Sequence, residues 1–289
     1  MLAGLLRETH WGAPFETHFI LKYLNRLPRY GDLSNVHNMA RLLGDILKER
    51  SAKQWWDTEF DVETFCASLE EPTYECLIDT FCRRRIRNFK APGWGDKTPH
   101  YVLELERLSV LFPESKFIVI VRDGRDVAMS LLAKPWGPSN VASCARYWVR
   151  CVERRPIYDQ LLTSNRLVEI RYEELLERPE QELGRVLDCL EVTEDRESII
   201  AGVERVDRRN KDKWRNKMSA VDQGIFQQIA ASALEANGYE VVPNLPQPSP
   251  LKLVGYNAHE RLSHALQLIR ANTVDAFAIK YMGRQPFAD

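Results

Sequence analysis

The segment "SKFIVIVRDGRDVAMSLL", Ser115 to Leu132, decides the fold class. Lys116 to Val121 is a short, largely apolar run rich in β-branched residues, which is typical of a buried strand. The chain turns polar at Arg122 and continues with apolar residues at helical spacing. In parallel α/β sheets, ligands bind beyond the carboxyl ends of the strands, and a following helix N-terminus attracts anions. Arg122, with Ser130 eight residues later, could bind a phosphate, but an ion pair with Asp126 at a solvated strand end is an equally good interpretation.

The rest of the chain is mostly helical in pattern. Met39, Leu42, Leu43, Ile46 and Leu47 have i, i+3, i+4 spacing, and a second strand is expected at Arg166 to Leu175. Strands separated by helices predict an α/β fold with a parallel sheet. Two strands are evident, which is few for a sheet. Helices are expected over 34–90, 101–111, 142–162, 179–190 and 223–236.

Composition excludes several classes of protein. The chain has 289 residues, 44% hydrophobic and 28% charged, with a net charge of −1, which is typical of a soluble globular protein. It shows no apolar run of about 18 residues, its first residues lack the charged-then-apolar pattern typical of a signal peptide, and its six cysteines form no C-x-x-C pair. We therefore expect a cytoplasmic protein with reduced thiols, no membrane span and no metal site. The basic run at Arg83 to Lys90 is interpreted as a solvated helix face, not a nucleic-acid site.

The stretch "KFIVIVRDGRDVAMS" resembles the 3′-phosphate-binding segment of the sulfotransferase family, which uses 3′-phosphoadenosine 5′-phosphosulfate (PAPS). The resemblance implies that Arg122 and Ser130 bind the 3′-phosphate of that donor. It also implies a three-layer α/β fold with a central parallel sheet, helix-rich and similar to nucleotide kinases.

Two earlier segments resemble the family's acceptor side. "APFETHF" is similar to an acidic segment whose glutamate serves as base for the acceptor, which implies this role for Glu16, with His18 as a second candidate. "GDKTPHY" is similar to a lysine-bearing loop and implies that Lys97 lies near the mouth of the active site. A carboxylate at a helix start and a solvated lysine are the structural alternatives.

Two later segments resemble the donor side. "EIRYEEL" followed by "RPE" implies that Tyr172 lies near the adenine, although a core tyrosine is almost as good an interpretation. "DRRNKDKWRNKMS" is similar to the family's basic loop that closes over the 3′-phosphate. It implies donor contacts from Arg209, Lys213 and Trp214, with a solvated basic turn as the alternative.

The resemblance also predicts the domain organisation. It covers residues 1–241, followed by a proline-rich linker at 242–250 and a C-terminal helical extension at 251–289, which caps the domain or forms a homodimer. The family's first strand and its R-S-G-T-T-like loop are not visible, and Met1 to Thr9 resembles the helix that follows them. We therefore expect an N-terminal strand to be missing, through an upstream start or because the chain is a remnant with impaired activity.

Three functions are candidates for this sequence, and a missing motif excludes one of them. The first is transfer of a sulfuryl group from PAPS, without a metal, to a hydroxyl or amine of a small-molecule, sugar or lipid-like acceptor. A small-molecule kinase would need a G-x-x-x-x-G-K-[ST] loop, which the sequence lacks. The third is a non-catalytic nucleotide-binding or interaction protein derived from a sulfotransferase.

Overall fold

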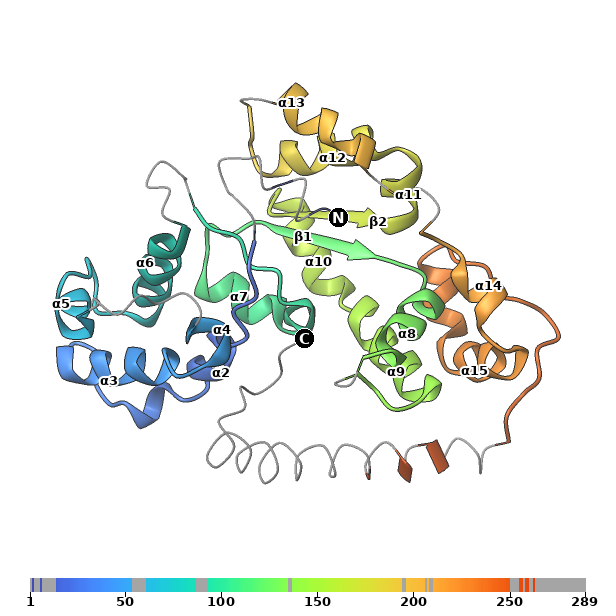
Figure 1. Cartoon of the computed structure of the whole chain (residues 1–289), viewed down its shortest axis with the longest axis horizontal. Coiled ribbons are helices and arrows are strands. Elements are labelled where there is room, and N and C mark those ends of the chain that lie inside the picture. The colour runs from blue at the N-terminus through green and yellow to red at the C-terminus, as the bar shows by residue number, and fades with distance from the viewer. Residues whose placement is uncertain are drawn as a thin grey trace. The chain divides into compact units, whose positions relative to one another are not determined.

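The computed structural model describes residues 2, 6, 14–53, 61–86, 93–134, 137–193, 196–205, 207, 210–249, 255–256, 258–259 and 262 (Figure 1). The chain forms two compact units. The first unit comprises Met1–Val119, Pro156–Ile170 and Glu174–Asp207. The second unit comprises Ile120–Arg155, Arg171–Glu173 and Arg208–Asp289.

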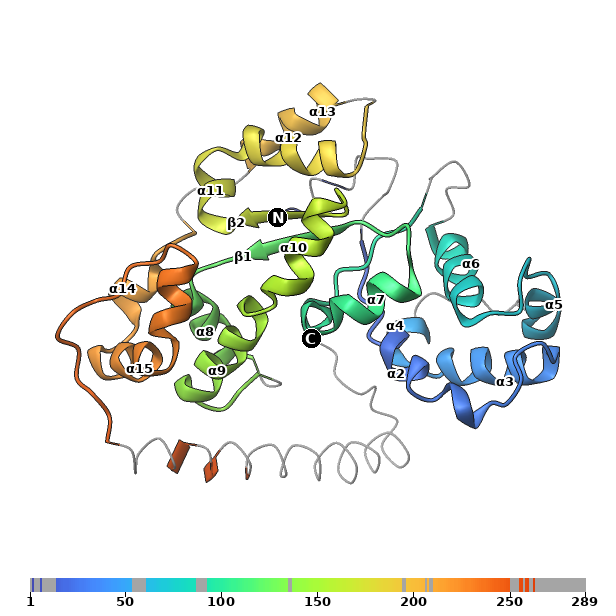
Figure 2. The ribbon, with the colours of Figure 1, turned by 180° about the vertical axis from the view of Figure 1, so that it is seen from behind.

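The described residues contain two strands, β1 (Phe117–Val121) and β2 (Leu167–Arg171), which pair as a parallel sheet visible from both sides (Figures 1 and 2). This confirms the predicted helix-rich α/β class. Val119 and Val121 are buried, whereas Ile120 is 42% exposed, so β1 is buried less completely than its composition suggests.

The second strand is shorter than predicted. It ends at Arg171, and the helix α11 (Tyr172–Glu177) begins directly after it, so the expected extension of the strand to Leu175 is wrong. Leu175 and Leu176 are both fully buried. Two adjacent residues of a strand point to opposite faces, whereas two adjacent residues of a helix can both contact one core.

The N-terminal half of the first unit is a set of short helices instead of the continuous helical stretch expected over 34–90. Its elements are α2 (Ile20–Leu24), η2 (Leu27–Arg29), α3 (Val36–Ile46), α4 (Arg50–Lys53), α5 (Val62–Ala67) and α6 (Tyr74–Ile86). Asn35 and Asp61 start new helices because each side chain accepts a hydrogen bond from a backbone N–H of the first turn. Met39, Leu42, Leu43 and Ile46 are buried, as their spacing predicts.

The remaining elements of this unit follow the sequence closely. The helix expected over 101–111 begins as a 3₁₀ segment, η3 (Pro99–Glu104), and continues as α7 (Leu105–Leu111). The helix predicted from Pro179 is confirmed as α12 (Pro179–Cys189), with proline in its first turn. It precedes α13 (Arg196–Ala201) and η4 (Gly202–Arg205).

The second unit packs α8 (Gly124–Leu132) against α9 (Val141–Val152) and α15 (Ala220–Ala236), with α14 (Lys213–Lys217) beside α8. Gly124 is required at the start of α8, because a Cβ there would lie 2.5 Å from the ring of Trp148 and 2.6 Å from that of Phe226. The helix expected over 142–162 is two helices, α9 and α10 (Arg155–Thr163). The residue at position 156 is proline, which has no backbone N–H to continue a helix through this point.

The remaining predictions concern the cysteines, membrane-spanning helices and the two ends of the chain. The six cysteines all lie in the described residues and form no disulfide with one another, and four of them are buried. In the part of the chain that the structure describes, no helix is long and apolar enough to cross a membrane. The expected helices at Met1 to Thr9 and over 257–282 lie, apart from single residues, outside the described residues.

Candidate functional site

The second unit places Arg122 directly after β1, in a half-buried cluster. Its Nη2 donates to Asp126 Oδ2 at 3.0 Å and to the carbonyl oxygen of Asn210 at 3.1 Å. The guanidinium lies over the Tyr172 ring, 4.4 Å from its centroid, and the Tyr172 hydroxyl accepts a hydrogen bond from Asn210 Nδ2 at 2.8 Å. The structure thus brings Arg122 and Tyr172 together, although 50 positions separate them in the sequence.

The expected alternative for Arg122, an ion pair with Asp126, is present, but not at a solvated end. The side chain of Asp126 is 1% exposed and that of Arg122 is 21% exposed. The other Asp126 oxygen, Oδ1, accepts the backbone N–H of Trp214 at 2.9 Å. Asp126 therefore holds the end of β1 and the start of α14 at the same point.

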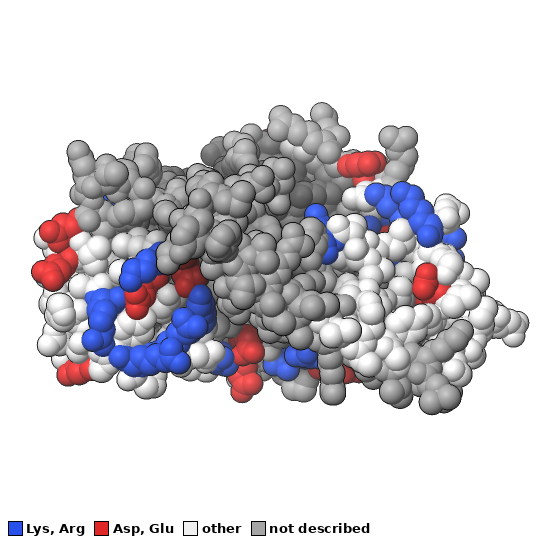
Figure 3. All heavy atoms as spheres, turned by 60° about the horizontal axis from the view of Figure 1, so that its bottom comes forward, with Lys and Arg blue, Asp and Glu red and all other residues white. Residues whose placement is uncertain are grey.

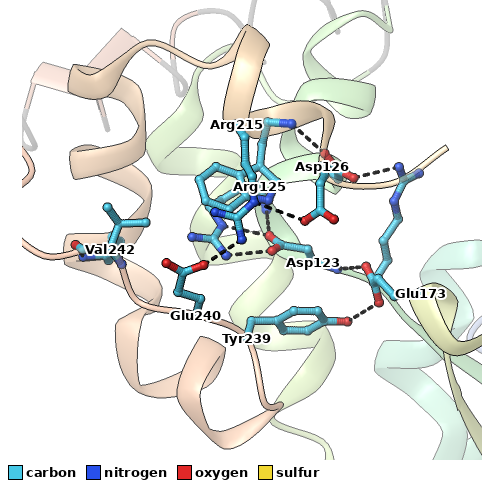
Figure 4. A network of polar contacts seen from close by, with 12 residues as sticks. Asp123, Arg125, Asp126, Glu173, Arg215, Tyr239, Glu240 and Val242 are labelled. Carbon is cyan, nitrogen blue, oxygen red and sulfur yellow. Dashed lines mark hydrogen bonds and ion pairs between the residues drawn. The ribbon is translucent and has the colours of Figure 1, made fainter. Parts of the chain in front are cut away.

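A second buried pair lies beside it (Figure 4). Arg125 donates from Nε and Nη2 to the two oxygens of Asp123, at 2.9 and 2.7 Å, and its side chain is 1% exposed. Its guanidinium lies 3.5 Å from the ring centroid of Trp214, and that of Arg215 lies 4.5 Å from the same ring. Two cations over one indole are electrostatically favourable, since the ring face carries negative charge.

Glu173 completes the support of this cluster (Figure 4). Its Oε1 accepts the backbone N–H of Asp123, and its Oε2 accepts the hydroxyl of Tyr239, both at 3.0 Å. Burial and the Glu173 carboxylate raise the pKa of Tyr239, which keeps its hydroxyl a donor. The first turn of α8 is therefore held rigidly in position.

Several donors of the cluster remain unsatisfied. Arg122 Nε, Arg125 Nη1 and Trp214 Nε1 are buried and have no hydrogen-bond partner among the described residues. A buried donor without a partner costs about 1–3 kcal/mol. An oxyanion admitted beside residues 210–214 would supply acceptors, and planar guanidinium donors match the oxygens of a phosphate.

The other residues predicted from the sequence to bind PAPS contribute no described hydrogen bond to the cluster. Ser130 lies on α8 and Lys213 begins α14; both are exposed, and neither side chain is hydrogen-bonded to the described residues of the cluster. Arg209 lies outside the described residues. The sequence reasoning missed Arg125 and Glu173. The only signal for Arg125 is its place two residues after an acidic helix cap.

In the first unit, residues 15–18 run alongside residues 95–98. Phe15 N–H donates to the carbonyl oxygen of Gly95 at 3.1 Å, and Lys97 N–H donates to that of Phe15 at 2.7 Å. Thr17 N–H donates to the carboxylate of Asp96 at 2.9 Å. This pairing brings Glu16 and Lys97 together across 81 positions of the sequence.

Glu16 bridges two predicted residues. Its Oε1 accepts a hydrogen bond from Lys97, and its Oε2 lies 3.1 Å from Nε2 of His18. Partial burial would raise the pKa of Glu16, but the hydrogen bonds from Lys97 and His18 outweigh it and lower the pKa below its usual value. The carboxylate is therefore ionised at neutral pH and lies at the surface, 42% exposed.

A second imidazole adjoins this group. His18 has a left-handed backbone, with φ of 55°, and its ring stacks on that of His100 with 5.4 Å between centroids. Burial, and secondarily the nearby His18, lower the pKa of His100. The structure thus gathers Glu16, His18 and Lys97, three residues singled out from the sequence, and adds His100. Within the described residues, no group of three His, Cys, Asp or Glu side chains is arranged to hold a metal ion.

Known proteins with similar sequences include sulfotransferases. A putative protein-tyrosine sulfotransferase of Caenorhabditis briggsae is 25% identical over 187 residues, which is 60% of this chain and 65% of that protein. Protein-tyrosine sulfotransferase 1 of Danio rerio is 29% identical over 34% of this chain and 28% of its own length. The nodulation protein NoeE of Sinorhizobium fredii is 28% identical over 50% and 44%. The chain thus spans less than two thirds of each of these relatives.

Two solved structures are similar, and a family model matches. The sulfotransferase domain from the curacin biosynthetic pathway aligns with a TM-score of 0.47 and 18% identity, over 83% of this chain and 93% of that one. The sulfotransferase domain of the Synechococcus PCC 7002 olefin synthase also gives 0.47, with 21% identity, over 83% and 91%. The model of the sulfotransferase family matches residues 10–196, well over half of the chain. This chain therefore belongs to the sulfotransferase family.

Proposed function

We propose that this protein transfers a sulfuryl group from PAPS to a hydroxyl or amine of an acceptor. The observation that carries the proposal is the cluster at the end of β1. There Arg122 lies over Tyr172, beside the buried Arg125 and Trp214, with N–H donors left without partners among the described residues. Guanidinium groups at the carboxyl end of a parallel strand, next to a helix N-terminus, suit a phosphate group.

The donor-side roles follow from this placement. Arg122 would bind the 3′-phosphate, and Asp126 would hold its guanidinium in place. The backbone of Trp214 is bound to Asp126, which places the loop before α14 beside Arg122. This loop is proposed to cover the same phosphate. Ser130, Lys213 and Arg209 are proposed as further donor contacts on the resemblance alone. Bound PAPS supplies an activated sulfuryl group, whose S–O bond to the 5′-phosphate breaks during transfer.

On the acceptor side, Glu16 is the proposed base. As the acceptor oxygen forms its bond to sulfur, the proton of that hydroxyl passes to Glu16, and adenosine 3′,5′-bisphosphate leaves with the electron pair of the broken bond. A carboxylate with a lowered pKa is ionised but weakly basic. Lys97 must therefore release Glu16 as the proton arrives. His18, in contact with the same carboxylate, is the second candidate.

The acceptor is proposed to carry a hydroxyl or an amine. A small-molecule, sugar or lipid-like hydroxyl follows from the resemblance, and the names of two relatives add the phenol of tyrosine in a protein. The non-catalytic alternative, a nucleotide-binding or interaction protein, keeps the donor site without transfer. A cytoplasmic location and a homodimer are further predictions.

Titration calorimetry tests the donor site first. Adenosine 3′,5′-bisphosphate should bind more tightly than ADP, and Arg122→Ala should weaken its binding at least about tenfold, the effect of losing a charge-assisted hydrogen bond. Arg178→Ala, on an exposed arginine of the first unit, is the matched control. Equal binding of the two nucleotides to folded protein would refute the donor assignment. Binding without transfer of label from PAPS to phenols, sugars or tyrosine peptides would favour the non-catalytic alternative.

A further inference from the structure

The first unit contains a cavity, widely open to solvent, that has no part in the groups described above. Its volume is about 470 Å³, within the range of small-molecule sites, roughly 300–1,000 Å³. Four lining residues are cationic and two are anionic, which leaves two net positive charges. Figure 3 shows Lys and Arg side chains in a curved row around Asp and Glu on this face. The lining residues are Tyr23, Arg26, Arg29, Tyr30, Arg41, Asp45, Lys48 and Glu49.

The acidic residues of this cavity are already bound. Asp45 accepts hydrogen bonds from the Tyr30 hydroxyl at 2.9 Å and from Lys48 at 2.7 Å. Oε1 of Glu49 accepts the Tyr23 hydroxyl at 2.8 Å and Lys22 at 2.5 Å. The hydrogen bond from Lys48 lowers the pKa of Asp45, whereas burial and the adjacent carboxylates raise those of both tyrosines. The tyrosines therefore remain neutral donors, and the two lysines offset the carboxylate charges.

The arginines are not neutralised in this way. Arg41 is held by two 3.0 Å bonds from its Nη2 to the carbonyl oxygens of Arg29 and Tyr30. The guanidinium of Arg26 lies 5.7 Å from the ring centroid of Tyr23. Within the described residues, the side chains of Arg26 and Arg29 make no hydrogen bond and no ion pair. Three guanidinium groups around one cavity repel one another, and a bound oxyanion would remove that repulsion.

The cavity also offers a hydrogen-bond acceptor for the part of a ligand that is not anionic. Oε2 of Glu49 has no hydrogen-bond partner among the described residues, so it can accept a bond from a ligand hydroxyl. We propose that this cavity binds a small hydroxylated oxyanion, a sugar ester of phosphate or sulfate. Its anionic group would lie on Arg26, Arg29 and Arg41, and its hydroxyl groups near Glu49. The proposal does not depend on the donor site, because the two sites share no residue.

Calorimetric titration of the full chain with glucose 6-phosphate, glucose 6-sulfate and glucose tests this proposal. We expect one or both esters to bind, and the ester that binds identifies the source of the anion; glucose should not bind. Arg26→Gln and Arg29→Gln should each weaken binding about tenfold or more. Arg83→Gln, which removes a cation paired with Asp79 on α6, is the charge-matched control and should change nothing.

Several outcomes would overturn the proposal. The first is that neither ester binds, and the second is that glucose binds as tightly as the esters. The third is that Arg83→Gln weakens ester binding as much as Arg26→Gln and Arg29→Gln do, because binding would then depend only on the general charge of the protein. Melting temperatures of the variants check that each is folded. Adenosine 3′,5′-bisphosphate should bind Arg26→Gln as it binds the parent chain, so failure of this site is distinguishable from failure of the donor site.

Discussion

The backbone N–H of Trp214 donates a 2.9 Å hydrogen bond to Oδ1 of Asp126, a residue 88 positions earlier in the chain. The other oxygen of the same carboxylate accepts Arg122. One buried carboxylate thus fixes both the residue proposed to bind the 3′-phosphate and the loop proposed to close over it. Because a carboxylate can accept several hydrogen bonds at once, a single aspartate is sufficient for this link.

Replacing Asp126 should therefore affect stability and binding together. In Asp126→Ala, the Trp214 N–H and the Arg122 guanidinium lose a buried acceptor, which should cost about 3 kcal/mol of unfolding free energy. Binding of adenosine 3′,5′-bisphosphate should weaken as well. Urea denaturation and calorimetry measure the two effects. Asp188→Ala, at an aspartate that is 70% exposed, should change stability by less than about 1 kcal/mol. A similar loss in both variants would contradict the role given to Asp126.

Gly124 should not tolerate a side chain. In Gly124→Ala, the new Cβ would overlap the rings of Trp148 and Phe226, at 2.5 and 2.6 Å, and overpacking of this kind costs about 1–3 kcal/mol. Gly184→Ala is the matched control, because nothing lies within 4 Å of its Cβ position in α12. There alanine should stabilise the helix by about 0.5–1 kcal/mol. Thermal unfolding measures the melting temperature of both variants. A change of the same sign in the two would contradict the close packing of Gly124 against Trp148 and Phe226.

The pH dependence of transfer should report on Glu16. Its pKa is lowered, so activity that needs the carboxylate ionised is retained above that pKa and is lost as the pH falls through it. Lys97→Met removes a hydrogen bond that lowers the pKa, so the acid limb of the rate profile should move to higher pH. Glu16→Gln should lower kcat by about 10²–10⁴-fold.

The control for this prediction is Lys48→Met, which removes a lysine from a different carboxylate, Asp45. Its acid limb should coincide with that of the parent chain. An unchanged acid limb in Lys97→Met, together with full activity of Glu16→Gln and loss of activity in His18→Gln, would assign the base to His18 instead.

His100 should make the protein less stable in mild acid. Its pKa is lowered in the folded state, so the unfolded chain binds the proton more readily. Its contribution to stability is complete above the ordinary value of about 6.5 and is lost as the pH falls towards the folded pKa. His100→Gln should therefore flatten the decline of Tm between neutral pH and about pH 5. An NMR titration of the imidazole should place its midpoint below 6.5, and a midpoint above that value would contradict the prediction.

Much of the local structure was predictable from the sequence. The strand before Arg122, the buried face of α3 and the start of α12 at Pro179 follow from apolar periodicity and from proline chemistry. The family resemblance singled out Glu16, His18 and Lys97 separately, and the structure brings their side chains together. The wrong predictions concern the ends of elements. One continuous helix was expected over 142–162, for example, where the structure has α9 and α10.

What the sequence by itself determined is the strand, turn and helix that place Arg122 and Ser130, because these depend on neighbours within a few residues. Tertiary structure alone decided that Asp126 binds the start of α14 at Trp214, that Tyr172 lies under Arg122, and that Ser130 and Lys213 are exposed. It also decided that Arg26, Arg29 and Arg41 surround one cavity. Such contacts join distant segments through packing and buried hydrogen bonds, whose partners no local pattern specifies.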